Sequence, residues 1–203
     1  MSTTTIHAGT AREIARIEEI GRGDATEFCG NWQTEDESGA AFDRIIAAAG
    51  IFESIAEVDG YYLAARPNRQ PKTARIDRIL FPKKPLKDAG WSSPIGIEIK
   101  RSGEKLGPAL CQAIDYTYAA FEVRSVFIHP AMIFLWPLVM PCRAVQSVMV
   151  HNGVGAVHVD DNGELRFESE YTLIGHRPDG PMSPGTYQLR VASHIAGRKV
   201  GSR

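Results

Sequence analysis

The chain has 203 residues, which suits one domain with a substantial hydrophobic core. Its apolar and charged fractions, 43% and 23%, are ordinary for a soluble globular protein. The longest apolar run, residues 131–139, is too short for a transmembrane helix and contains a proline. The three cysteines are odd in number and widely spaced, which argues against a disulfide framework. Because the first residues also lack the layout of a secretory leader, we expect a cytoplasmic protein with reduced thiols and no membrane association.

The net charge of −1 conceals a strong asymmetry along the chain. Residues 1–65 hold four Lys or Arg against twelve Asp or Glu, whereas residues 66–105 hold eleven against four. Residues 66–105 therefore carry a net charge of +7, which suits contact with the phosphate backbone of a nucleic acid. The alternative is a solvated lysine-rich loop.

The first part of the chain is predicted to hold a polar extension, a helix and a strand. Residues 1–38 are acidic and polar, and we expect them to form an extension with one short amphipathic helix at 10–20 and a loop up to 38. A helix is predicted at 40–49, where a glycine follows it. Residues 52–58 are expected to continue this helix or to form another turn, and 61–65 to form a strand.

The middle of the chain is predicted to alternate strands with one helix. We expect a strand at 74–81, a basic loop at 82–94, and a strand around Glu98 that stops near Ser102. A helix should begin near Pro108 and run to about residue 121. Two further buried strands are predicted at 125–128 and 132–136.

The last part of the chain is predicted to be rich in β-structure. Residues 145–150, 154–159 and 165–171 alternate or run apolar, and 160–163 has the composition of a hairpin turn. The expected organisation is therefore an extension (1–38), a core (39–142), and a β-rich region with a basic tail packed on that core (143–203).

Two acids and a lysine stand out within the predicted strands. Residues two apart in a strand point to the same face, so Glu98 and Lys100 should project together, away from Ile97 and Ile99. Burying such charges is costly unless they are paired or hold an ion. With Asp77 in a similar apolar run, they are the groups needed to hold Mg²⁺ and hydrolyse a phosphodiester. A surface ion pair and a turn aspartate, contributing less than about 1 kcal/mol, would be the plain alternative.

The order of Asp77 followed by Glu98-Ile99-Lys100 resembles the PD-(D/E)xK, or restriction-endonuclease-like, nuclease superfamily. Downstream, Gln112 and Tyr116 are similar to the QxxxY element of its RecB-like branch. The resemblance covers roughly residues 40–130, and Ile76 stands where the motif has proline. It implies an α/β fold with a restriction-endonuclease-like core, in which helices flank a central mixed sheet (αβββαβ) and additional C-terminal hairpin strands follow.

The resemblance also implies roles for individual residues. Mg²⁺ or Mn²⁺ would be held by Asp77, Glu98 and the carbonyl of Ile99, with Lys100 as the catalytic lysine and Gln112 beside it. An acid from the first helix would complete the metal site, for which we prefer Glu53 over Asp43 and Glu57. Contacts to nucleic acid are expected from Tyr116, Arg78, Arg101, Lys83 and Lys84.

The function that follows is a metal-dependent nuclease acting on DNA, for which a homodimer would suit the cutting of two strands. One alternative is a catalytically inactive nuclease-like module that binds nucleic acid or a protein partner. Another is an unrelated small enzyme whose acids act on a substrate other than nucleic acid.

Overall fold

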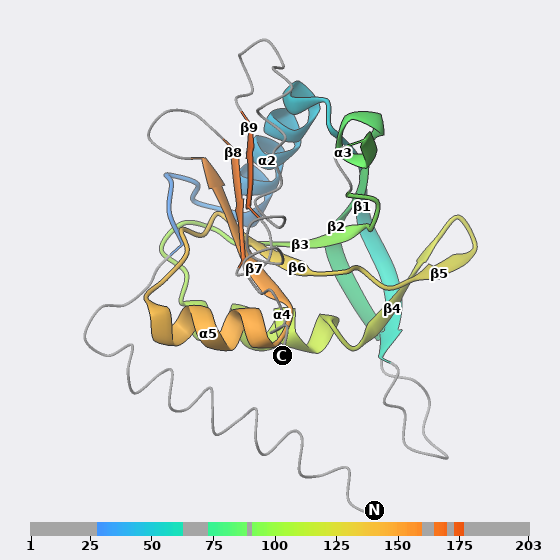
Figure 1. Ribbon diagram of the computed structural model, residues 1–203. Coiled ribbons are helices and arrows are strands. Elements are labelled where there is room, and N and C mark those ends of the chain that lie inside the picture. The colour runs from blue at the N-terminus through green and yellow to red at the C-terminus, as the bar shows by residue number, and fades with distance from the viewer. Residues whose placement is uncertain (1–27, 63–72, 89–90, 160–164, 170–172, 177–203) are drawn as a thin grey trace, which may run out of the picture.

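The computed structural model describes residues 28–62, 73–88, 91–159, 165–169 and 173–176 (Figure 1). The helix expected at 10–20 and the hairpin turn expected at 160–163 lie outside these residues. The described elements are helices α2 (Glu35–Ala49), α3 (Lys84–Asp88), α4 (Leu106–Tyr116) and α5 (Arg143–His151), and strands β1 (Phe52–Tyr62), β2 (Thr73–Pro82), β3 (Ile95–Ile99), β4 (Ala119–Val123), β5 (Val126–Ile128), β6 (Ile133–Trp136), β7 (Val154–Val159), β8 (Leu165–Glu168) and β9 (Leu173–His176).

The described strands form one nine-stranded sheet in the order β5-β4-β1-β2-β3-β6-β7-β8-β9. β1, β2 and β3 are antiparallel neighbours, whereas β6 is parallel to β3 and β7 is parallel to β6. Antiparallel pairs also stand at the two ends of the sheet, β4 with β5 and β8 with β9. The expectation of an α/β fold with a mixed sheet flanked by helices is confirmed.

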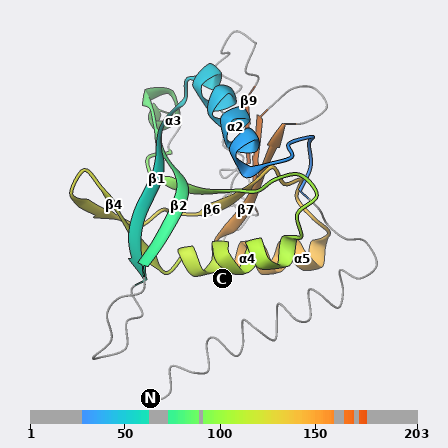
Figure 2. The same cartoon turned by 180° about the vertical axis from the view of Figure 1, so that it is seen from behind.

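The helices cover both faces of the sheet, with α2 on one face and α4 and α5 on the other (Figures 1 and 2). The alternation of side chains along β3 explains this division. Ile95, Ile97 and Ile99 belong to the buried cluster that includes Phe42 and Ile46 of α2. The cluster on the opposite face joins β6 to apolar residues of α4 and α5. Gly96 and Glu98 therefore point away from α2.

The helix α2 begins five residues before the predicted start, because a capping box with Thr34 as the N-cap residue fixes the helix start. The backbone N–H of Glu37 donates to Thr34 Oγ1 at 3.1 Å, and Glu37 Oε2 accepts from the backbone N–H of Thr34. This reciprocal pair satisfies two of the N–H groups that a helix start leaves unpaired. Glu35 is consequently the first residue of a helix, not part of a loop.

Four other predicted elements are wrong in type or extent. Residues 52–58 form the first part of β1 and not a helix. Glu57 has a φ of 48°, which interrupts the alternation of side chains along the strand. The apolar residues Ile55 and Val58 are therefore three positions apart, which is a helical spacing. Residues 145–150 lie in helix α5 and not in a strand. The prediction is wrong because a short apolar run is compatible with both the helical and the strand period. The helix predicted to reach residue 121 ends at Tyr116, and β4 follows. A short helix, α3, also interrupts the loop predicted at 82–94.

The capping box at the start of α2 gives a stability prediction. Thr34→Ala removes the side-chain oxygen that accepts from Glu37, so the free energy of unfolding should fall by about 0.5–2 kcal/mol. Urea denaturation measures the change. Gln33→Ala, an adjacent exposed position that contributes only its backbone N–H, is the matched control, and equal stability of the two variants would contradict the capping role.

Candidate functional site

The strands β2 and β3 separate where Asp77 faces Glu98. Their pairing includes Leu80 with Ile95 and Arg78 with Ile97, and it goes no further. Beyond it, the backbone N–H of Ile99 donates to Asp77 Oδ2 at 2.7 Å. A carboxylate thus takes the place of a strand carbonyl, so Asp77 lies in the fork between the two strands.

Glu98 and Lys100 form a buried ion pair on the same face of β3, as the strand period predicts. Lys100 Nζ lies 2.7 Å from Glu98 Oε1, and the two side chains are 9% and 2% exposed. The other oxygen, Glu98 Oε2, is buried without a hydrogen-bond partner among the residues that the structure describes. A carboxylate oxygen left in this state is costly and can accept a further cation or donor.

The helix acid that joins this pair is Glu35, which the sequence analysis missed. Glu35 Oε1 lies 3.2 Å from Lys100 Nζ, although the two residues are 65 positions apart in the chain. The ammonium therefore contacts carboxylates from two different elements. The available signal was the Thr34-x-x-Glu37 pattern, which marks a helix start and would have placed Glu35 in its first turn.

Glu98 and Asp77 have raised pKa values, so they are harder to ionise than free carboxyl groups. Burial raises the pKa of Glu98 to about 8, and the charge of Asp77 adds to the rise although Lys100 opposes it. Burial also raises the pKa of Asp77, against the hydrogen bond from Ile99. Burial lowers the pKa of Lys100, but the carboxylates of Glu98 and Glu35 raise it by more, so the net change in this pKa is upward. The cluster therefore favours added positive charge, and its lysine stays protonated.

Gln112 and Tyr116 lie on α4 and connect that helix to β2. Gln112 Nε2 donates to the Tyr116 hydroxyl at 2.8 Å, and this hydroxyl donates to the backbone carbonyl of Arg75, two residues before Asp77. Tyr116 is 4% exposed. The ring of Tyr116 is covered and its hydroxyl contacts β2, so a contact of Tyr116 with nucleic acid stays a prediction. Gln112 is half-buried, and its contact with the Tyr116 hydroxyl helps to hold that hydroxyl against β2.

Arg78 is also bound within the protein rather than presented to a ligand. Its Nε and Nη2 each donate to one oxygen of Asp43 at 2.9 Å, and its Nη1 donates to the carbonyl of Asp77 at 2.7 Å. This bidentate pair joins α2 to the strand that carries Asp77. Arg78 was a candidate for nucleic-acid binding and Asp43 for metal binding; in this structure the two side chains bind each other, and both roles stay predictions.

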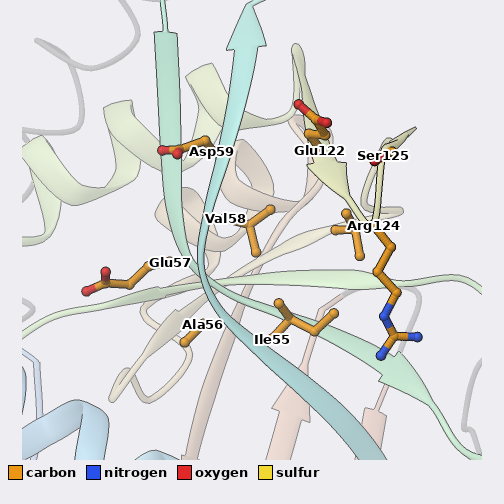
Figure 3. A pocket seen from close by; sticks show the side chains of 9 residues that line it. Ile55, Ala56, Glu57, Val58, Asp59, Glu122, Arg124 and Ser125 are labelled. Carbon is orange, nitrogen blue, oxygen red and sulfur yellow. The ribbon is translucent and has the colours of Figure 1, made fainter.

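The preferred helix acid, Glu53, is likewise misplaced by the sequence analysis. It lies on β1, not on a helix, and pairs with Arg124 at the β4–β5 turn. Glu57 is on the same strand and pairs with Arg75 at 3.3 Å. Glu57 and Arg124 line a cleft of about 550 Å³ between β1 and β4 (Figure 3). No predicted catalytic residue lines this cleft, so it is separate from the fork of β2 and β3.

The three remaining basic candidates are exposed but differ in position. Arg101 follows Lys100 directly and has a side chain that is 60% exposed, with Glu104 at 3.8 Å. Lys83 and Lys84 lie beyond the far end of β2, about 20 Å along the strand from Asp77. Lys84 pairs with Asp88 in α3. Arg101 is thus the basic residue of this group placed beside the candidate site.

Two kinds of feature, a cluster of metal-binding side chains and a membrane-spanning helix, are absent from the described ranges. These ranges contain no group of three His, Cys, Asp or Glu side chains that could hold a metal ion. They also contain no helix with the length and apolar character that crossing a membrane requires. A scan against protein-family models found no match, and searches of the curated proteins and of the solved structures matched no protein.

The raised pKa of Glu98 predicts a pH-dependent penalty on folding. Between the ordinary glutamate pKa of 4.5 and about 8, the unfolded chain loses a proton that the native carboxyl retains, so stability falls as pH rises through this window. Glu98→Gln removes the titration and should gain stability relative to the wild type from pH 5 to pH 8, by a few kcal/mol.

Chemical denaturation of both proteins across this pH range measures the effect. Glu122→Gln, at an exposed position of β4, is the matched control. A stability difference between Glu98→Gln and the wild type that does not change with pH would contradict the assignment.

Proposed function

We propose that the chain is a metal-dependent nuclease that hydrolyses phosphodiester bonds, most readily in DNA. The observation that carries this proposal is the meeting of Asp77, Glu98 and Lys100 in the fork of β2 and β3, where a hydrogen bond of 2.7 Å and an ion pair of 2.7 Å fix them. Two acids beside one lysine, sheltered from water, suit the binding of a cation and of a phosphate.

The proposed cation is Mg²⁺ or Mn²⁺, and the donor set fits it. Both acids have raised pKa values, and Glu98 Oε2 lacks a partner in the described part of the chain. Mg²⁺ is commonly bound through one or two carboxylates together with waters and substrate phosphate, so a cage of three acidic side chains is not required. Asp77, Glu98 and the Ile99 carbonyl would hold the ion, which would supply Lewis-acid activation of a water molecule.

Lys100 would act as a fixed positive charge toward the scissile phosphate. A lysine can serve as a general base only when its pKa falls toward neutrality. Glu98 and Glu35 move the pKa of Lys100 in the opposite direction. We therefore infer that Lys100 offsets charge that develops on the phosphate and orients the attacking water, while Arg101 meets the adjacent backbone.

We also propose that the core is restriction-endonuclease-like. The order α2, β1, β2, β3, α4 and then β6 follows the αβββαβ arrangement, with β6 parallel to β3. The short helix α3 is inserted between β2 and β3, and the β4–β5 hairpin before β6. This order, with both acids on β2 and β3, supports the proposal, and a fold alone does not assign a function.

The catalytic proposal is tested with plasmid, linear duplex and single-stranded DNA in Mg²⁺ or Mn²⁺. The wild type should cleave at least one substrate, and Asp77→Asn and Lys100→Met should each reduce the rate about 10²–10⁴-fold. Asp77→Asn removes a carboxylate that would hold the cation, and Lys100→Met removes the positive charge that would face the reacting phosphate. Asp59→Asn, an exposed acid on β1, is the matched control. Equal cleavage by the three variants would show that a contaminant, not this site, is responsible.

Metal binding is tested separately from catalysis by thermal denaturation. Mg²⁺ or Mn²⁺ at saturation should raise the melting temperature of the wild type by several degrees, because a ligand of the native state stabilises it. Asp77→Asn and Glu98→Gln should lose this increase, whereas Asp59→Asn should keep it. An increase that survives in both site variants would place the ion elsewhere.

One observation favours the inactive nuclease-like module as a second candidate. Lys100 Nζ is engaged by two carboxylates, Glu98 and Glu35, and an ammonium held in this way is less available to a phosphate. Such a module would bind DNA with a strong dependence on salt and without turnover. Binding by the wild type in the absence of cleavage, under all the metal conditions above, would favour this candidate.

A further inference from the structure

The β4–β5 hairpin carries the sheet beyond its helices and ends it at β5 (Figures 1 and 2). β5 pairs with β4 on one side, and no strand in the described ranges pairs with its other side. Its three residues, Val126–Ile128, carry no charge, and the neighbouring Arg124 is turned toward Glu53 of β1. An uncharged edge strand offers its free backbone groups to another chain.

The hairpin turn decides which backbone groups face this open edge. Arg124 and Ser125 have φ values of 51° and 64°, which is the two-residue type I′ turn of tight hairpins. The residues that flank such a turn, Val123 and Val126, form a hydrogen-bonded pair, so the next pair, Glu122 with Phe127, is not hydrogen-bonded. The N–H and C=O of Phe127 consequently point away from β4.

Apolar side chains are exposed at the same end of the sheet. The rings of Tyr61 and Phe127 are 6.1 Å apart and are 41% and 55% exposed. Val126 is 61% exposed and, as the neighbour of Phe127 along the strand, projects from the opposite face. These are three of the six large apolar residues exposed in the described part of the chain, and such clustering marks an interaction surface.

We propose that two copies of the chain associate through β5, as antiparallel strands about a two-fold axis beside Phe127. Each Phe127 N–H would donate to the Phe127 carbonyl of the other copy, so the same groups serve on both sides. Val126 would face Ile128 of the partner subunit, and the two pairs of Tyr61 and Phe127 would form a row of four rings. No charged residue of β5 opposes this pairing.

The exposed area indicates a weak, reversible dimer. An aromatic side chain buries about 150–250 Å² when it is covered, so the half-exposed rings of two copies leave on the order of 400 Å² for the pair to cover. Even with Val126 and the backbone added, the interface stays below the ~1,200 Å² typical of stable complexes. We therefore expect an association in the range of transient complexes, with a dissociation constant of roughly 10 µM to 1 mM. The association does not depend on nuclease activity.

Sedimentation of the full chain over about a hundredfold range of concentration tests the proposal. The wild type should shift from monomer toward dimer. Phe127→Glu should weaken association at least about tenfold, because it places two like charges opposite each other. Phe127→Pro should do the same through loss of the outward N–H, a change that an edge strand tolerates. Phe127→Leu, which keeps both features, should remain within a few-fold of the wild type.

Val139→Glu, at an exposed apolar position outside the β4–β5 region, is the matched control and should dimerise as the wild type does. Circular dichroism verifies that each variant is folded. A wild type that stays monomeric at every concentration would overturn the proposal, as would a dimer that persists in both Phe127→Glu and Phe127→Pro or is lost equally in Val139→Glu.

A covalent measurement tests the register without relying on weakened variants. In a hydrogen-bonded antiparallel pair the opposed Cα atoms lie about 5.5 Å apart, which is within the range that a disulfide spans. With exposed Cys142 replaced by serine, Phe127→Cys should give a disulfide-linked dimer under mild oxidation, in which two thiols lose two electrons and two protons to added oxidised glutathione. Failure to exceed the Cys142→Ser background would contradict the two-fold register.

Discussion

The buried pair of Glu98 and Lys100 governs the centre of this protein. A carboxyl group and an ammonium that are 2% and 9% exposed have given up most of their hydration, and a contact of 2.7 Å between them offsets part of that loss. The pair therefore constrains the elements around it. The second oxygen of Glu98 and the nearby Asp77 leave the cluster with more negative than positive character, which is the physical basis for the proposed cation site.

Three contacts from outside the sheet place this pair. The capping box of α2 puts Glu35 at the helix start, where it reaches Lys100. Arg78 binds Asp43 of α2 and the carbonyl of Asp77, and Tyr116 of α4 binds the carbonyl of Arg75. Both faces of the sheet are thus anchored to the same short stretch of β2. Rigid support from helices on each side is what a site needs to hold charges at fixed distances.

The sheet separates two kinds of chemistry. The charged cluster lies in the middle, at β2 and β3, whereas the uncharged edge lies at β5, four strands from β3 and therefore on the order of 20 Å away. The intervening β1 is bent at Glu57, and the cleft between β1 and β4 opens beside this bend (Figure 3). Association through β5 would leave the fork of β2 and β3 uncovered, so two copies could present two sites.

The sequence by itself determined the strand period, and with it the shared face of Glu98 and Lys100, the division of the β3 isoleucines from these charges, and the mixed α/β architecture. It could not determine which charges meet. Glu35 is 65 residues from Lys100, and Arg78 is 35 from Asp43, so these contacts depend on how α2 packs across the sheet. Local periodicity directs a side chain relative to its own strand or helix, as it did for Gln112 and Tyr116. Only long-range packing decided that Glu53 turns to Arg124, that Tyr116 is covered, and that the charge of Lys100 is shared by two acids.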